Sequence, residues 1–203
     1  MSISHRIRQY AVNAAPIFGS AGAALLTYAW HRRWETAEDG SRRRGWLDGF
    51  CHGGTAVAVA LPAAPYVRNP LAFVPVALAS AIAIDLDHVV IARTFEMKRC
   101  QSLGSRPSSH SIVAMLAASA AIERLYPEQH LGLAMLLGLG SHLLRDIGTG
   151  GAPLFLPRRI IEVPYQRVIP LLGVLAISSR QATRLHLGQQ LSQLNLHFVS
   201  NDE

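Results

Sequence analysis

The chain has 203 residues, of which half are hydrophobic and only 16% are charged, whereas soluble domains typically carry about a quarter of charged residues. Its two cysteines, Cys51 and Cys100, form no CxxC pair and so give no support to a disulfide framework or a cysteine-based zinc knuckle. The formal net charge of +6 suits either a nucleic-acid binder or a membrane protein, so the positions of the basic residues must decide between them.

Apolar segments separated by short polar breaks run along most of the chain, and we predict that they are helices. Their lengths and their alanine, leucine and valine content argue against strands. Several approach the roughly 20 residues that span a bilayer. The sequence therefore predicts an all-α fold, a polytopic membrane bundle of about five to six apolar helices with a metal site at one rim. A soluble alanine-rich bundle is the alternative. The predicted helices are 11–30, 46–66, 70–91, 109–125, 130–147 and 168–178.

Three parts are expected along the chain. Residues 1–45 provide an N-terminal apolar helix and a basic loop, residues 46–178 form the main helical domain, and residues 179–203 form an amphipathic tail. The apolar positions of the tail follow helical spacing, which favours a surface helix that packs on the body of the protein. These positions are Leu187, Leu191, Leu194 and Phe198.

The arginines are distributed unevenly among the loops. If alternate loops lie on opposite sides of a membrane, the 31–45, 93–108 and 157–167 loops share one side and hold most of the basic residues. This asymmetry predicts that these loops are cytoplasmic and that the protein is a multi-pass protein of the inner membrane. The basic loops lack interleaved aromatic residues that stack on bases, so nucleic acid is not an expected partner. The opposite side receives only Arg6, Arg8, Arg68 and Arg124.

Four polar clusters interrupt the apolar segments: "CHGGTA" from 51, "DLDH" from 85, "SRPSSHS" from 105 and "GSHLLRDIGTGG" from 140. Each has an ordinary explanation on its own. His52 can be a core histidine, "DLDH" and His110 can lie at helix caps, and His142 can pair with Asp146 one helical turn later. In the alternating topology, however, all four clusters lie at the same cytoplasmic end.

A bound divalent metal would explain this convergence. A carboxylate in an apolar segment costs roughly 2.5–3.5 kcal/mol on insertion scales, and metal binding offsets such costs. Imidazole and carboxylate ligands without thiolate suit zinc, with manganese or iron as alternatives. The glycines of "GTGG" would let the chain turn sharply beside the metal. The candidate ligands, enough for two ions, are His52, Asp85, Asp87, His88, His110, His142 and Asp146.

The same residues suggest a reaction. A two-metal site activates a water and clamps a scissile phosphate, so we predict catalytic roles for Asp87, His110 and Arg106. Arg106 would hold an anionic substrate through a bidentate contact. Because Asp85 and Asp87 point to different faces of a helix, we expect one to bind metal and the other to orient a histidine.

The leading hypothesis is a membrane-bound, metal-dependent hydrolase that acts on a phosphoester. Its expected partners are membrane lipid and an anionic or phosphoester small molecule; the oligomeric state is left open. Two alternatives remain: a non-enzymatic membrane protein whose metal serves structure or transport, and a soluble helical binding protein.

The order of these motifs, over roughly residues 50–160, resembles the YdjM-like family, described as inner-membrane-associated, metal-dependent hydrolases. The resemblance implies metal-site roles for the candidate ligands of all four clusters. Two departures stand out: Ala83 and Ile84 precede Asp85 where the family usually has proline, and Ser105 replaces a histidine of the third motif. Losing that imidazole removes a ligand or a proton carrier, so the resemblance also implies a weakened or altered activity.

Overall fold

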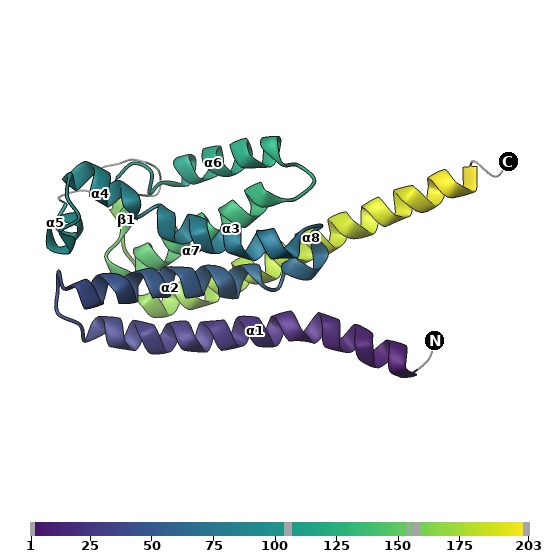
Figure 1. Cartoon of the computed structure of the whole chain (residues 1–203), viewed down its shortest axis with the longest axis horizontal. Coiled ribbons are helices and arrows are strands. Elements are labelled where there is room, and N and C mark those ends of the chain that lie inside the picture. Colours follow the sequence, from purple (N-terminus) through teal and green to yellow (C-terminus); the bar gives the residue numbers. More distant parts are fainter. Residues whose placement is uncertain (1–2, 104–106, 154, 156–158, 201–203) are drawn as a thin grey trace.

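The computed structural model describes residues 3–103, 107–153, 155 and 159–200, with side chains described from 14 to 189. The chain is predominantly helical (Figure 1). Two short strands, β1 (Ala152–Pro153) and β2 (Ile160–Ile161), pair in an antiparallel hairpin. The helices are α1 (Ile3–Glu35), α2 (Arg42–Ala60), the 3-10 helix η1 (Ala64–Tyr66), α3 (Pro70–Ala83), α4 (Leu86–Ala92), α5 (Met97–Gln101), α6 (Ile112–Leu125), α7 (Leu131–Thr149) and α8 (Tyr165–Ser200).

Helix α7 is the central element of the bundle. It packs against α2, α3, α6 and α8, while α1 runs along α2 (Figure 1). Apolar residues of α2, α3 and α7 share one buried cluster, in which Phe73 and Ala134 are fully covered and Leu137 is 1% exposed. This cluster fixes how α3 and α7 lie against each other. Helix α7 carries predicted site residues, and α3 leads into the turn that carries others.

Helices α3 and α7 approach each other closely at Gly138. A Cβ atom at this position would lie 2.2 Å from the Ala77 carbonyl oxygen and 2.1 Å from the Ser80 hydroxyl oxygen. The Ser80 hydroxyl donates a hydrogen bond to the same Ala77 carbonyl, so it is not free to move aside. Small residues allow helix backbones to come this close.

We expect Gly138→Ala to lower the free energy of unfolding by about 1–3 kcal/mol, the usual cost of forcing an extra methyl into a packed contact. The matched control is Gly173→Ala in α8, where an added Cβ meets nothing within 4 Å and the better helix propensity of alanine should stabilise slightly. Thermal unfolding in detergent, followed by circular dichroism, measures both variants. Equal stability of the two would show that the contact is not tight.

The prediction of five to six membrane-spanning helices is wrong. Within the described part of the chain, one segment is long and apolar enough to cross a membrane, Pro70–Ala92, which comprises 23 residues, few of them buried. Helix α6 has only 14 residues, about 21 Å at 1.5 Å per residue, which is short of a bilayer core of about 30 Å. Helices α2 and α7 are 19 residues long, but charged and polar side chains occupy their ends nearest the predicted site.

Three local features also differ from expectation. The predicted 70–91 helix breaks at Ile84 and Asp85 into α3 and α4, and α5 lies in a segment expected to be a loop. The predicted 168–178 helix and the tail form one continuous helix, α8. Leu187 is half-buried; Leu191, Leu194 and Phe198 lie outside the described side chains, so the amphipathic stripe and the division into three parts stay predictions.

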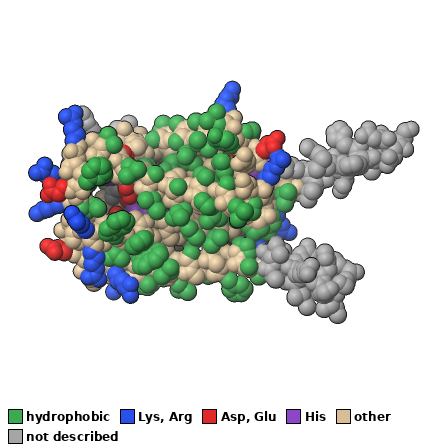
Figure 2. Space-filling model, in the orientation of Figure 1, with side chains coloured by type: hydrophobic (Ala, Val, Ile, Leu, Met, Phe, Trp, Pro, Cys, Tyr) green, Lys and Arg blue, Asp and Glu red, His purple; other side chains and the backbone are tan. Residues whose placement is uncertain are grey.

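The loops rich in arginine gather at one end of the molecule. The connection between α1 and α2, the α4–α5 region and the chain after α7 lie at this end, and both termini lie at the other (Figure 1). Lys and Arg side chains crowd this end in the space-filling view, beside a hollow in which acidic and histidine side chains are visible (Figure 2). The basic end therefore coincides with the predicted site, and its cytoplasmic orientation stays a prediction.

Candidate metal centre

Four regions of the fold bring the predicted ligands to the basic end. Helix α2 and helix α7 contribute one wall each, the turn between α3 and α4 contributes the third, and the residues before α6 contribute the fourth. The inner side chains are buried, whereas the α4 carboxylates and imidazole are partly exposed. In this order the regions supply His52; His142 and Asp146; Asp85, Asp87 and His88; and His110.

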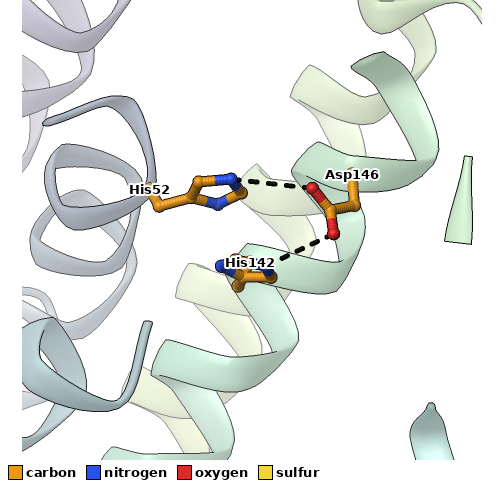
Figure 3. A group of neighbouring side chains, drawn as sticks. All are labelled: His52, His142 and Asp146. Carbon is orange, nitrogen blue, oxygen red and sulfur yellow. Dashed lines mark ion pairs between the residues drawn. The ribbon is translucent and has the colours of Figure 1, made fainter. Parts of the chain in front are cut away.

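Helix α7 presents two candidate ligands on one face because His142 and Asp146 are four residues apart. The Asp146 Oδ2 atom lies 3.3 Å from His142 Nε2, and its Oδ1 atom lies 3.6 Å from His52 Nε2 on α2 (Figure 3). The His52 and His142 rings are stacked, with their centroids 3.7 Å apart. Asp146 therefore faces two imidazoles from different helices, in an environment almost closed to solvent.

Asp85 occupies the middle of the cluster. Its Oδ1 atom lies 3.4 Å from His110 Nε2 and 3.5 Å from His142 Nε2. It lies 3.9 Å from His88 Nδ1. Because α3 ends at Ala83, the turn that follows swings this carboxylate toward α7 rather than along the outer face of α3. One oxygen atom that faces several imidazoles is the arrangement expected of a shared metal ligand.

Asp87 takes a different position, on the outer side of the imidazoles. One oxygen lies 3.1 Å from His110 Nδ1 and the other lies 2.8 Å from His88 Nδ1. Ser109 donates a hydrogen bond from its hydroxyl to Asp87. A carboxylate on the Nδ1 side of His110 leaves Nε2 pointing into the cluster. This geometry matches an orienting carboxylate behind a metal-binding histidine.

A backbone contact orients His142 in the same way. Its Nδ1 atom lies 2.7 Å from the Ala81 carbonyl oxygen, so Nδ1 carries the proton that this carbonyl accepts. The Nε2 atom then points toward Asp85 and Asp146. Among the described side chains, His142 Nε2 is one of the buried nitrogen atoms that make no hydrogen bond. Burial lowers the pKa of His142, but the charges of Asp146 and Asp85 raise it overall, so this nitrogen suits either a proton or a metal cation held between the two carboxylates.

The structure adds two residues that the sequence analysis missed, Asp48 and Arg145. Arg145 is fully buried. Its Nη1 atom donates to Asp48 Oδ1 at 2.6 Å and to His52 Nε2 at 3.0 Å. Two signals were available: Asp48 precedes His52 by four residues, as His142 precedes Asp146, and Arg145 is a charge in an otherwise apolar helix. The sequence does not reveal that Asp48 of α2 and Arg145 of α7 contact each other.

The contact between Arg145 and His52 bears directly on metal binding. It uses the Nε2 lone pair of His52, and a metal held between this nitrogen and Asp146 would need the same lone pair. In the metal-free protein, Arg145 is therefore the cation beside His52. Before a metal could bind His52 Nε2, Arg145 would have to give up its contact with His52 and keep the one with Asp48. Its guanidinium lies 5.2 Å from the centre of the Trp34 ring, which helps to hold it in place.

The donor set fits a divalent ion with nitrogen and oxygen ligands. Three groups of side chains have ligand atoms within 4.8 Å of one another, and among the described residues none of these groups contains a cysteine. Imidazole with carboxylate suits zinc, manganese or iron, and the structure does not select among them. The groups are His52, His142 and Asp146; Asp85, His88 and His110; and Asp48, His52 and Asp85.

His110 is the cluster histidine outside a helix, and its protonation is set by its neighbours. Burial alone would lower its pKa, but hydrogen bonding to Asp85 and Asp87, together with the charge of Asp146, raises the pKa to about 9. The metal-free protein therefore keeps His110 protonated at neutral pH. A metal ligand must give up this proton.

We expect zinc affinity to rise between pH 7 and pH 9, by up to about tenfold per pH unit, because each increase removes more of the proton that competes for His110. Competition with a chromophoric chelator across this range measures the slope. Asp87→Asn is the informative companion variant. It removes one of the charges that hold the proton on His110, so the zinc affinity of this variant should rise less steeply with pH. A flat profile in the unmodified protein would exclude His110 as a ligand.

Two remaining predictions concern the chain around the cluster. Arg106 and Ser105 lie outside the described residues, so the substrate-binding role of Arg106 stays a prediction. The sharp turn after α7 is confirmed: Gly151 has a φ of +85°, and a Cβ there would lie 2.3 Å from Ile160 Cγ2. The turn feeds the β1–β2 hairpin, where Ala152 pairs with Ile161.

Taken together, the fold and the site define a helical protein with an apolar segment long enough to cross a membrane and a largely buried histidine–aspartate cluster that could hold a metal ion. A model of the YdjM inner membrane protein family matches residues 47–196, which include the four regions of the cluster. The chain therefore belongs to this family, whose name places it at the inner membrane. Searches of curated proteins and of solved structures each gave no significant match.

Proposed function

We propose that this protein is a membrane-bound, metal-dependent hydrolase that acts on a phosphoester. The observation that supports this most strongly is the central position of Asp85, which faces both His110 and His142. The same nitrogen of His142, Nε2, also faces Asp146. Two groups of ligands thus meet at shared carboxylates, as in sites that hold two ions side by side.

The residues divide into two sets of roles. His52, His142 and Asp146 would hold one ion, and Asp85, His88 and His110 would hold another. Asp87 orients His110 from behind. Divalent ions at such a site supply Lewis acidity and activate water for attack on an ester. The partly exposed side of the cluster, at Asp85 and His88, is where substrate would enter.

Elemental analysis combined with a phosphoester panel tests this proposal. The purified protein should contain zinc or another divalent transition metal, and it should hydrolyse at least one ester in a reaction that a chelator abolishes and the metal restores. Metal content without any hydrolysis would instead support the alternative, a metal site that serves structure or transport. Absence of bound metal after loading would refute both.

The orientation of the site is a separate proposal, supported by the basic loops that surround it. We expect Gln101→Cys, in a background without the two native cysteines, to resist a membrane-impermeant thiol reagent in intact cells, because the positive-inside rule puts this end in the cytoplasm. Labelling should appear once the cells are opened. Tyr126→Cys, at the far end of α6, is the companion position. Labelling of Gln101→Cys from outside would contradict a cytoplasmic site.

A further inference from the structure

An apolar groove lies between α1, α2 and α3, close to the metal centre. It encloses about 230 Å³, and every residue along its walls is apolar or glycine. Leu26, Phe50 and Ile82 are between 42% and 50% exposed, so the groove opens to the surface. Its main apolar side chains are Leu26, Trp30, Phe50, Val57, Leu78 and Ile82.

The groove shares two of its walls with the metal centre. On α2, Gly49 and Gly53 line the groove and directly follow Asp48 and His52, which face the cluster. On α3, Ile82 lies three residues before Asp85. The helices that line the groove therefore also carry candidate ligands of the centre, within one to three residues of the lining positions. It is also bounded by α3, part of the segment that is long and apolar enough to cross a membrane.

The uncharged groove and the basic end of the molecule together match an amphiphile that has an apolar chain and an anionic head group. The groove itself carries no charged side chain. Exposed arginine and lysine side chains crowd the end of the molecule where the cluster opens (Figure 2). The clustered carboxylates would repel a phosphate on their own, so an anionic head group could approach them only with a metal cation bound. The basic residues at this end include Arg42, Arg43, Arg93, Lys98 and Arg99.

We propose that the groove holds an acyl chain of an anionic phospholipid whose phosphate head group reaches the metal centre. This inference rests on the proposed function, because it takes the phosphoester of that reaction to be the lipid head group. It narrows the substrate class from phosphoesters in general to membrane phospholipids. The open wall at Gly49, where an added Cβ meets nothing within 4 Å, provides the space for the chain.

The full-length protein, purified in detergent and loaded with zinc, can be incubated with dimyristoyl phosphatidic acid and examined by native mass spectrometry. We expect the lipid to be retained by the unmodified protein and lost in Gly49→Leu, which fills the groove from α2. Displacing even two methylenes weakens binding about tenfold. Ile82→Trp fills the same groove from α3 and should act alike. Gly173→Leu, at an open position on α8, is the matched control and should retain the lipid.

A second arm uses glycerol 3-phosphate, which has the same kind of head group without the chains, and it should bind at least about tenfold more weakly. Equal retention by folded, zinc-containing Gly49→Leu or Ile82→Trp would overturn the proposal, as would equal binding of glycerol 3-phosphate. If the groove variants lose the lipid but the unmodified protein shows no hydrolase activity, the result would support lipid binding in the groove and refute the proposed hydrolase function. The two failures are therefore distinguishable.

Discussion

Asp146→Asn is expected to lose most of its bound metal while keeping the fold. The substitution preserves the shape of the side chain but removes the charge that lies between His52 and His142. Even residues that only orient metal ligands cost 10–100-fold in affinity when replaced, so a direct ligand should cost at least that much. Any hydrolase activity should fall in parallel. Zinc content after dialysis and zinc affinity by chelator competition provide the measurements.

The outcome separates two roles for Asp146. If it only accepts a hydrogen bond from His142, the substitution alters stability by about 1 kcal/mol and leaves the metal content unchanged. Glu123→Gln is a suitable control, because Glu123 also pairs with a histidine, His130, but at the opposite end of α7. Full metal and full activity in Asp146→Asn would rule out a metal centre built on α7.

Arg145→Met is expected to give two effects of opposite sign. Removing the guanidinium leaves Asp48 without its buried partner, and breaking a buried ion pair costs about 3–5 kcal/mol. Because the Asp48 side chain is 30% exposed, we expect the lower end of this range. Zinc affinity should nevertheless rise about tenfold, since the Nε2 lone pair of His52 is freed from a charged hydrogen bond worth about 1.5 kcal/mol.

The double variant Asp48→Asn with Arg145→Met tests the origin of the stability loss. It removes both charges, so the metal-free protein should recover most of the stability that Arg145→Met loses. Denaturant unfolding of the single and double variants, with and without zinc, provides the comparison. If Arg145→Met also lowers zinc affinity, Arg145 supports the centre by orienting His52 rather than by competing with a cation.

The membrane prediction shows where reasoning from the sequence failed. Hydrophobic content and segment length predicted five to six spanning helices, but these properties do not say where a helix starts and ends. Helix α6 begins only at Ile112, because Ser111 caps it and accepts from the Ala114 amide. Helix α7 has the length but ends in the buried polar residues of the metal centre. Within the described residues, only Pro70–Ala92 combines sufficient length with a sufficiently apolar composition, although its last third carries Asp85, Asp87 and His88.

The residue types of the candidate centre could be predicted from the sequence, whereas the separate role of each residue could not. The histidines and aspartates stood out because buried ionisable groups in apolar helices need partners, and the four-residue spacing in α7 placed His142 and Asp146 on one face. Sequence reasoning also predicted that one of Asp85 and Asp87 would orient a histidine, without saying which one. The contacts of Asp87 with His110 and Ser109 favour Asp87, and these contacts depend on the turn between α3 and α4.

The sequence by itself determined the helical class, the family and most of the side chains able to bind a metal, with Asp48 as the exception, because these depend on composition and on the order and spacing of motifs along the chain. Only the tertiary structure decided which helices meet, and therefore that Arg145 of α7 reaches Asp48 and His52 of α2. The physical reason is that spacing within a helix is set by its 3.6-residue turn. Contact between helices instead depends on side-chain packing at points such as Gly138, where α7 lies directly against the backbone of α3.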